Sequence, residues 1–220
     1  MTQDLQTDRP RDVRLTVAVL GAAGVGRLVV HALRQQGHNV LALVRKQEQA
    51  DAMELLGAVT VLGDLTGDWD AVLKGADAVV WAAGAGASGQ FQQIDGRALE
   101  QVADHLAANG PKRLVVVSSM GVDRPEQMPP FLDAVLRVKA VSDAHVQASG
   151  LDYTIVRPGG LTNDQGSGQV SMGMPAPGGM IPREDVAAIV AACLTDDSTI
   201  GKTFEVVAGK QPVADALAAV

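Results

Sequence analysis

The stretch LTVAVLGAAGVGR, Leu15 to Arg27, decides the fold of this chain, because an apolar run leads into clustered glycines and then into a helical pattern. Its first part, VAVL (17–20), has no alternating polar residue, which predicts a strand buried on both faces. Gly21, Gly24 and Gly26 follow at once, and apolar residues then recur at helical spacing. A strand, a glycine turn and a helix N-terminus in this order can hold a pyrophosphate, because unpaired backbone N–H groups and the helix dipole attract anions. The stretch therefore indicates a dinucleotide site, with an ordinary glycine-rich turn as the alternative.

Length and composition predict one globular domain that does not bind nucleic acid. The chain has 220 residues, and 47% of them are hydrophobic, which is enough for a substantial core. Its net charge is −7 and its aromatic content is 3%, so clustered cations and stacking rings for a nucleic acid are not expected. We expect residues 1–12 to form a flexible tail and residues 13–220 to form a single domain, as a monomer or a homodimer.

The cysteine and the hydropathy pattern predict a cytoplasmic protein that does not enter a membrane. Cys193, the single cysteine, lies in an apolar helical pattern and is expected to be a buried structural thiol. No stretch reaches the ~18 apolar residues of a membrane span, and the polar start of the sequence has no signal-peptide core. The four histidines are scattered without the spacing of metal ligands, so no metal site is predicted.

Predicted strands and helices alternate along the chain. Strands are expected at 17–20, 38–45, 58–62, 77–83, 113–119, 154–158 and 203–207. Helices are expected at 25–36, 48–56, 69–74, 94–109, 131–149, 183–194 and 213–220. The glycine-rich segments 84–90 and 163–181 are predicted to be a flexible loop and a mobile loop or short hairpin, respectively.

The aliphatic character of the strands predicts a single-domain α/β fold, a Rossmann-like doubly wound parallel sheet with helices on both faces. In such sheets ligands bind beyond the carboxyl ends of the strands, near the point where the strand order reverses. The loops that follow the predicted strands should therefore converge on one crevice.

The end of the second predicted strand favours NADP(H) over NAD(H), although NAD(H) is possible. An NAD site usually has Asp or Glu here, about 20 residues after the glycines, to bind the ribose hydroxyls. This chain has Arg45 and Lys46, and a cation suits a 2′-phosphate, unless the two simply begin a solvated helix. Arg27, directly after the glycine turn, is a candidate second contact. Asp64, after the third strand, is placed to touch the adenine end or, equally, to cap a turn.

Taken together, these segments resemble the atypical short-chain dehydrogenase/reductase superfamily. The resemblance is greatest to its small NAD(P)H-binding branch, which is also described as NAD-dependent epimerase/dehydratase-like. It extends from about Leu15 to Val207 and is carried by VAVLGAAGVGR, LALVRK, GDL, DAVVWAAGAG, RLVVVSSMGVD, LRVKAVSDAHVQASGLDYTIVRPGGLT and IPREDVAAIV.

The resemblance implies a role for each loop in cofactor binding. The expected contacts are Gly21, Ala22, Gly24, Val25 and Gly26 at the pyrophosphate, Arg45 at the 2′-phosphate, Asp64 and Leu65 at the adenine, Ala82, Ala83 and Gly84 along the ribose, and Ser118, Lys139, Arg157, Pro158 and Gly159 around the nicotinamide.

The chain departs from the superfamily pattern at two places. The family turn is usually GxxGxxG, but here Gly26 comes five residues after Gly21 rather than six, so a residue is missing or Gly26 serves two purposes in a tighter loop. Enzymatic members carry Tyr-x-x-x-Lys on the helix after the fifth strand, where the tyrosine transfers a proton and the lysine holds the ribose. Lys139 is present, but Val135 stands four residues earlier and Leu136 follows it, and neither can transfer a proton.

Two functions fit these residues. The first is an NADP(H)-dependent oxidoreductase that passes hydride to a small organic acceptor, such as a flavin, quinone or tetrapyrrole-like compound, without a tyrosine general acid. Its candidate catalytic residues are Ser118, at the acceptor, and Lys139, at the ribose; otherwise Ser118 bonds the loop backbone and Lys139 faces solvent. The second is a non-catalytic NADP(H)-binding protein that reports redox state to a partner. A sugar-nucleotide epimerase is less favoured, because it needs a tyrosine acid and normally a larger substrate-binding region after the sixth strand. The only tyrosine, Tyr153, is expected in the core rather than as a catalytic acid.

Overall fold

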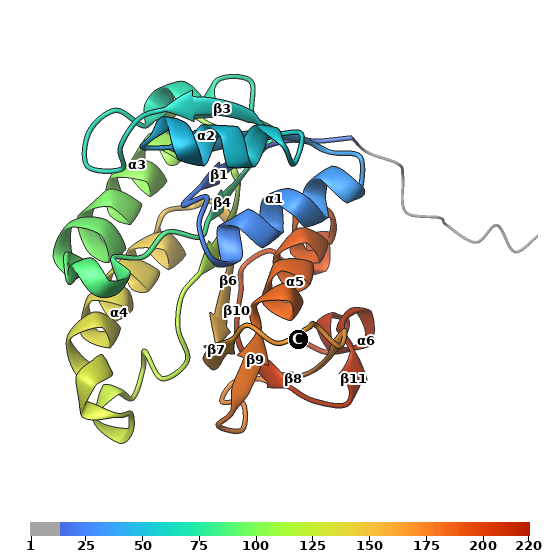
Figure 1. The fold of residues 1–220 in the computed structure, drawn as a ribbon. Helices are drawn as coiled ribbons and strands as arrows, with labels where there is room; N and C mark the ends of the chain where they lie inside the picture. Colours follow the sequence, from blue (N-terminus) through green and yellow to red (C-terminus); the bar gives the residue numbers. More distant parts are fainter. Residues whose placement is uncertain (1–13) are drawn as a thin grey trace, which may run out of the picture.

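The computed structural model describes residues 14–220, so the expected tail at 1–12 lies outside the described residues. A nine-stranded sheet crosses the molecule in the order β11-β8-β10-β6-β5-β4-β1-β2-β3 (Figure 1). Its strands are β1 (Thr16–Leu20), β2 (Asn39–Val44), β3 (Val59–Leu62), β4 (Ala78–Trp81), β5 (Arg113–Val117), β6 (Asp152–Pro158), β8 (Gln169–Gly173), β10 (Lys202–Ala208) and β11 (Gln211–Pro212). The seven strands from β10 to β3 in this order are parallel to one another.

Helices cover both faces of the sheet. The α-helices are α1 (Val25–Gln35), α2 (Gln47–Glu54), α3 (Leu99–Asn109), α4 (Asp133–Ala148), α5 (Arg183–Thr195) and α6 (Val213–Leu217). Helices α1 and α5 lie side by side over one face, and α3 and α4 lie over the other (Figure 1). The predicted Rossmann-like, doubly wound α/β fold is therefore confirmed.

Successive side chains of β1 point to opposite faces of the sheet and belong to two separate hydrophobic cores. Val17 and Val19 pack with α1, α2 and α5, whereas Ala18 and Leu20 pack with α3 and α4 on the opposite face. Because all four side chains are fully buried, the strand needs aliphatic residues at every position, as its sequence shows. The order of strands reverses between β1 and β4. This switch point is at the carboxyl end of β1, where the glycine turn follows the strand.

The prediction for residues 163–181 was wrong in part. Residues of this segment form β8, which pairs antiparallel with β10 and extends the main sheet, and also β9 (Met180–Pro182). β9 pairs with β7 (Gly160–Thr162) in a separate two-stranded sheet. Val170 and Met172 alternate over too few residues, among glycines and prolines, to predict a strand. The strand β8 forms because it pairs with the edge of β10.

Several elements differ from their predicted bounds at the ends. The helix expected at 94–109 begins earlier as a π-helical segment, η3 (Gln92–Ala98), before α3. The helix expected at 131–149 begins with a 3₁₀ turn, η5 (Pro130–Leu132), before α4. The short helix expected at 69–74 is a 3₁₀ turn, η1 (Asp70–Leu73), and segment 84–90 holds another, η2 (Gly86–Ser88).

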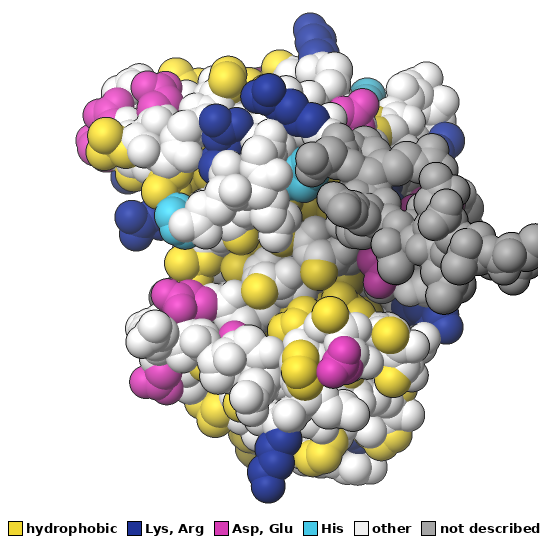
Figure 2. Space-filling view, turned by 90° about the vertical axis from the view of Figure 1, so that its right-hand side faces the viewer, with side chains coloured by type: hydrophobic (Ala, Val, Ile, Leu, Met, Phe, Trp, Pro, Cys, Tyr) yellow, Lys and Arg dark blue, Asp and Glu magenta, His cyan; other side chains and the backbone are white. Residues whose placement is uncertain are grey.

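The distribution of surface charge and the burial of the cysteine agree with what the composition predicts. Acidic and basic side chains are interspersed over the face seen in Figure 2, with no continuous basic area among the side chains described there. Within residues 14–220, no helix is long and apolar enough to cross a membrane. Cys193 is fully buried, as predicted, and burial raises the pKa of its thiol to about 12.

A buried carboxylate fastens two loops to β10. Glu205 is fully buried, and its oxygens accept hydrogen bonds from Arg124 Nη2 at 2.7 Å, from the Gly121 amide at 2.9 Å and from the Ala176 amide at 3.0 Å. Burial raises the pKa of Glu205, but these donors outweigh burial and hold the pKa below its ordinary value. The folded state therefore favours the ionised form of this carboxyl group.

We expect Glu205→Gln to lower the free energy of unfolding by about 1–3 kcal/mol at neutral pH, because Arg124 loses its buried counter-charge. Urea denaturation measures this loss. Because the folded-state pKa is depressed, the stabilisation is present above the ordinary value of 4.5 and disappears as the pH falls through the folded-state pKa. Asp133→Asn, which removes the exposed pair with Arg137, is the control and should leave the midpoint near wild type. Equal stability of Glu205→Gln and wild type would contradict the assignment.

Candidate functional site

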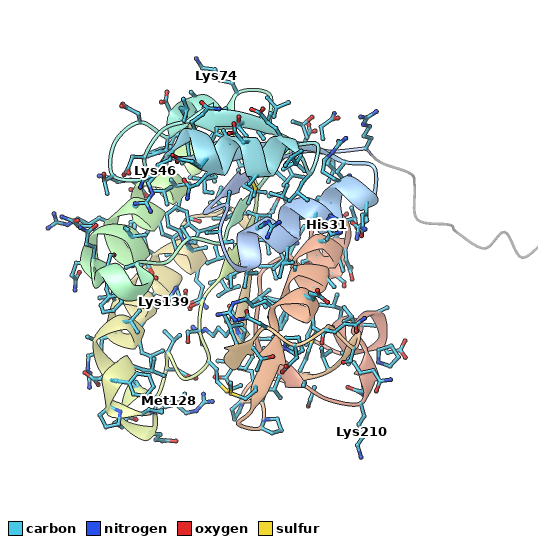
Figure 3. The ribbon with its side chains drawn as sticks, in the orientation of Figure 1. His31, Lys46, Lys74, Met128, Lys139 and Lys210 are labelled. Atoms are coloured by element: carbon cyan, nitrogen blue, oxygen red, sulfur yellow. The ribbon has the colours of Figure 1, made fainter. Side chains whose placement is uncertain are left out.

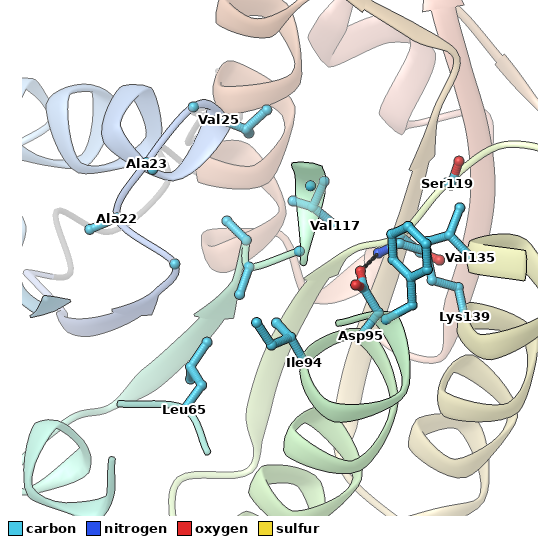
Figure 4. A pocket seen from close by; sticks show the side chains of 18 of the residues that line it. Ala22, Ala23, Val25, Leu65, Ile94, Asp95, Val117, Ser119, Val135 and Lys139 are labelled. Atoms are coloured by element: carbon cyan, nitrogen blue, oxygen red, sulfur yellow. Dashed lines mark ion pairs between the residues drawn. The ribbon is translucent and has the colours of Figure 1, made fainter. Parts of the chain in front are cut away.

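A cleft of about 690 Å³ opens beyond the carboxyl ends of the parallel strands, at the predicted switch point. It is lined by the glycine turn, by the ends of β2, β4 and β5, by residues of η3 and by the start of α4. Figure 4 shows the turn residues Ala22, Ala23 and Val25 on one side and Val135 and Lys139 of α4 on the other. The predicted convergence of loops on one crevice is thus observed.

The glycine turn brings α1 unusually close to the sheet. A Cβ atom on Gly26 would overlap the carbonyl oxygen of Gly21 and lie 3.3 Å from Cβ of Ala82. A Cβ atom on Gly21 would collide in the same way with the backbone at Ala83. Gly26 therefore provides the close helix–strand contact within the shortened turn, which is the second of the two alternatives given above.

The amino end of α1 fits a pyrophosphate. Gly24 occupies the N-cap with a φ of 50°, and no described side chain caps the helix by a hydrogen bond. A Cβ atom on Gly24 would meet nothing within 4 Å, so the backbone is open on this side. Uncapped N–H groups at the positive end of the helix dipole, beside an open backbone, are what a phosphate group needs.

Arg45 and Asp64 lie together at the other end of the cleft. Arg45 follows β2, and its backbone N–H donates to Gln49 Oε1 at 3.0 Å, which ties the residue to α2. Asp64 Oδ1 accepts from the N–H and hydroxyl of Thr66, and these bonds, more than the charge of Arg45, lower the pKa of Asp64. Asp64 thus caps a turn, which was one of the two expectations for it, and it also lines the cleft.

Lys139 reaches the cleft in an ion pair that the sequence did not predict. Its Nζ atom lies 2.9 Å from Oδ1 of Asp95, which comes from η3 (Figure 4). Asp95 is buried, and its Oδ2 accepts from the Ala85 amide at 2.9 Å, in the loop after β4. The pair holds Lys139 on the inner side of α4, whereas Lys74 and Lys210 point outward from the molecule (Figure 3). Lys139 is therefore positioned at the site, rather than in solvent.

Ser118 lines the cleft at the end of β5 and is bonded to a buried acid. Its Oγ donates to Oδ2 of Asp143 at 2.9 Å, and Arg157 Nε donates to the same oxygen at 2.9 Å. Asp143, on the buried face of α4, and Arg157, on β6, are both buried. The hydroxyl of Ser118 is thus held by a side chain and not by the loop backbone, which was the alternative considered from the sequence.

The remaining wall of the cleft, near Ser118 and Lys139, is apolar. It is formed by Phe91, Ile94, Val117, Phe131, Leu132, Val135 and Leu161. Phe131 is 80% exposed, so this wall has an open, aromatic rim. Arg183 also lines the cleft, and its Nη1 donates to Asn163 Oδ1 at 2.8 Å.

Most of the residues expected at the cofactor line this one cleft. They are Gly21, Ala22, Gly24, Val25, Arg45, Asp64, Leu65, Ala82, Ala83, Gly84, Ser118 and Lys139. The other five, Gly26, Arg27, Arg157, Pro158 and Gly159, are not among the lining residues.

The positions outside the lining have physical reasons. Gly26 packs behind the turn, and Arg27 lies on the exposed side of α1. Arg157 follows Ile155 by two residues, and strand alternation therefore points it under α4, towards Asp143, rather than into the cleft. Tyr153 lies at the amino end of β6, away from the carboxyl ends of the strands.

Asp95 and Asp143 are buried polar residues that sequence reasoning missed. Asp95 shares a helical stripe with Leu99 and Val102, and Asp143 shares one with Leu136 and Val146. A carboxylate on an otherwise buried apolar stripe is an unusual residue that needs a partner, and this was the available signal. The apolar wall had no comparable signal, because its residues come from four separate segments of the chain.

The matched family decides the coarse identity of the site. Residues 21–197 match the family described as NAD(P)H-binding, which covers the glycine turn and every other part of the cleft. The chain belongs to the NAD(P)H-binding family. The predicted resemblance is therefore confirmed, and the family supports a nicotinamide cofactor for this protein.

Relatives of this NAD(P)H-binding protein share its length and fold. An uncharacterized sugar epimerase of Bacillus subtilis, YhfK, is 35% identical over 92% of this chain and 99% of its own. A putative NAD-dependent epimerase/dehydratase from Bacillus halodurans is 35% identical, with a TM-score of 0.89 over 94% of this chain and all of its own. The Escherichia coli O157:H7 protein ChuY, named an anaerobillin reductase, is 23% identical with a TM-score of 0.78 over 88% of this chain and 97% of its own, which shows a shared fold.

We expect Gly26→Ala to weaken nicotinamide-cofactor binding and to lower the free energy of unfolding by about 1–3 kcal/mol, because the new methyl group would displace Gly21. Thermal unfolding and calorimetric titration with NADPH measure the two effects. Gly67→Ala is a matched control, since a Cβ at that position meets nothing within 4 Å. If both variants behave like wild type, the tight contact between Gly26 and Gly21 is not required.

Proposed function

We propose that this protein is an NADP(H)-dependent reductase that passes hydride to a small, conjugated organic acceptor without a tyrosine general acid. The observation that carries the proposal is the division of a single cleft into two parts. One part has the glycine turn and Arg45, and the other is an apolar wall with Ser118 and Lys139 at its base. When bound, the reduced nicotinamide supplies the hydride, and the protein supplies orientation and a dry, apolar surface.

The preference for the 2′-phosphate rests on Arg45. It lies at the end of β2, where an NAD-binding protein usually has a carboxylate, and it lines the cleft. Its guanidinium is solvent-exposed, so it is free to form charge-assisted hydrogen bonds with a phosphate group. Asp64 nearby accepts both hydrogen bonds from Thr66 through Oδ1.

The shape and chemistry of the second part favour a flat acceptor such as a flavin, quinone or tetrapyrrole-like compound. Phe91 and Phe131 offer ring faces, and Val135 replaces the tyrosine that a carbonyl- or sugar-converting relative uses. An Escherichia coli protein of the same fold is named for a reductase activity, which agrees with this proposal. Epimerisation of a sugar is less favoured, because Tyr153 lies far along β6 from the cleft.

A non-catalytic redox sensor is the second candidate. It is favoured by Val135, because a side chain that cannot transfer a proton occupies the usual catalytic position. In this case the loops after β4 and β5 would present the state of the bound cofactor to a partner.

We expect Arg45→Ala to weaken NADPH binding by about 1–3 kcal/mol and to leave NADH binding nearly unchanged, because only NADPH has the phosphate. Calorimetric titration with each cofactor measures the difference. Lys46→Ala, a neighbouring cation outside the cleft lining, is the matched control. Equal losses for both cofactors would assign Arg45 to a shared part of the dinucleotide.

The activity itself is tested by mixing the protein with NADPH deuterated at C4 and with a flavin or quinone. We expect loss of NADPH absorbance, and a primary isotope effect from one of the two C4 positions, because a bound nicotinamide presents one face to the acceptor. Tight binding of NADPH with no turnover over a panel of acceptors would favour the sensor. Absence of NADPH and NADH binding would contradict both candidates.

A further inference from the structure

Behind Ser118 lies a buried side-chain cluster that the binding of a cofactor does not explain. Ser118 lines the cleft, and its Oγ is hydrogen-bonded to Oδ2 of Asp143 at 2.9 Å. Arg157 Nε bonds the same oxygen from β6 at 2.9 Å. The cluster thus connects a hydroxyl group in the cleft with a carboxyl group that is 99% buried.

The second carboxyl oxygen of Asp143 is the unusual atom. Oδ1 is buried and has no hydrogen-bond partner among the described residues. An ionised carboxylate with an unpartnered buried oxygen is costly, whereas a protonated one carries no charge on that atom. Burial accordingly raises the pKa of Asp143, although Arg157, Ser118 and Lys139 oppose the rise. Asp143 therefore retains its proton to a higher pH than an ordinary aspartate.

The charges around Asp143 let the proton leave and return. Arg157 faces it from β6 and stabilises the anion directly. Lys139, one turn earlier on α4, is engaged by Asp95 of η3 and acts on Asp143 only at longer range. Ser118 faces it from β5. A carboxyl group balanced between burial and one direct cation is suited to exchange a proton rather than to hold one charge state.

We propose that Asp143 and Ser118 form a proton relay that delivers a proton to the acceptor at the cleft, in place of the missing tyrosine. The relay rests on the reductase function proposed above. Ser118 is the group that touches the acceptor, and Asp143 acts through it as the positioning residue and proton source.

The relay is balanced in atoms and charge. The acceptor takes hydride from the reduced cofactor and, at its oxygen or nitrogen, the hydroxyl proton of Ser118. The O–H bond of Ser118 breaks as Oγ takes the proton from Oδ2 of Asp143, so that serine is regenerated and Asp143 becomes a carboxylate beside Arg157. A hydronium ion from solvent then returns the proton to Asp143 through Ser118 and is left as water, so the net reaction consumes one solvent proton. In the protonated state Asp143 donates to Oγ, and the hydroxyl hydrogen of Ser118 rotates towards the cleft.

Two acceptors separate proton delivery from hydride transfer. Menadione, a quinone, needs a hydride and a proton, whereas the N-methylacridinium cation takes a hydride alone and becomes neutral. The measured quantity is the ratio of the two rates, menadione over N-methylacridinium, at saturating NADPH. We expect Ser118→Ala and Asp143→Asn each to lower this ratio by at least about tenfold, since general acids contribute about 10²–10⁴-fold.

The controls distinguish the relay from a structural role. A purely structural loss would slow both acceptors together and leave the ratio unchanged. Ser142→Ala, at a buried serine that bonds the Lys139 carbonyl, is the matched control and should keep the wild-type ratio. Circular dichroism and the NADPH dissociation constant establish that each variant is folded.

The outcomes are separable. An unchanged ratio in both folded variants would overturn the relay and leave the reductase function intact, and a fall in Ser118→Ala alone would remove Asp143 from it. Should Asp143→Asn not fold, the pH dependence decides. The wild-type ratio should fall as the pH rises through the pKa of Asp143, and the ratio of Ser118→Ala should not. A pH-independent wild-type ratio would overturn the relay. A wild-type protein that reduces neither acceptor would overturn the reductase function, and the relay with it.

Discussion

Burial of both faces of the central strands is the constraint on which the rest of the molecule depends. Because β1, β4 and β5 are covered by helices on each side, their interior positions have room only for aliphatic and tryptophan side chains. Polar residues that could bind a ligand therefore occur at the ends of these strands. The reversal of strand order between β1 and β4 opens a cleft at the carboxyl end, and the glycine turn, Ala83 and Ser118 arrive there together.

Buried carboxylates are the exceptions to this rule, and three of them anchor loops. Asp95 accepts from the Ala85 amide, Glu205 from the amides of Gly121 and Ala176, and Asp185 from the amide of Gly168 at 2.8 Å. Each therefore fixes backbone that would otherwise leave donors unsatisfied. Asp143 differs from these three, because side chains alone bond it. Its partners join the cleft to the interior instead of joining a loop to the sheet.

The sequence was sufficient to predict those parts of the protein that depend on local pattern. A parallel sheet with helices on both faces follows from aliphatic runs that alternate with helices. The carboxyl ends of such strands lie at one edge of the sheet, so Arg45 and Asp64 were expected beside the glycine turn. Asp95 and the strand β8 were beyond local pattern. A π-helical segment places Asp95 opposite Lys139, and β8 is ordered by pairing with β10 and β11, which lie far along the chain from it. Arg157 was expected at the nicotinamide from a family motif, but alternation along β6 turns it to Asp143.

The five-residue spacing of the glycine turn also sets the rotational phase of α1. Each residue added to a helix turns everything after it by about 100°. Restoring the sixth residue between Gly24 and Gly26 would therefore either loosen the turn or rotate Val29, Val30 and Leu33 away from the core that α5 shares. The length of the turn therefore determines which face of α1 is buried. A change from one spacing to the other needs coordinated substitutions along the whole helix. The packing of α1 against the core therefore opposes any change in the length of the turn.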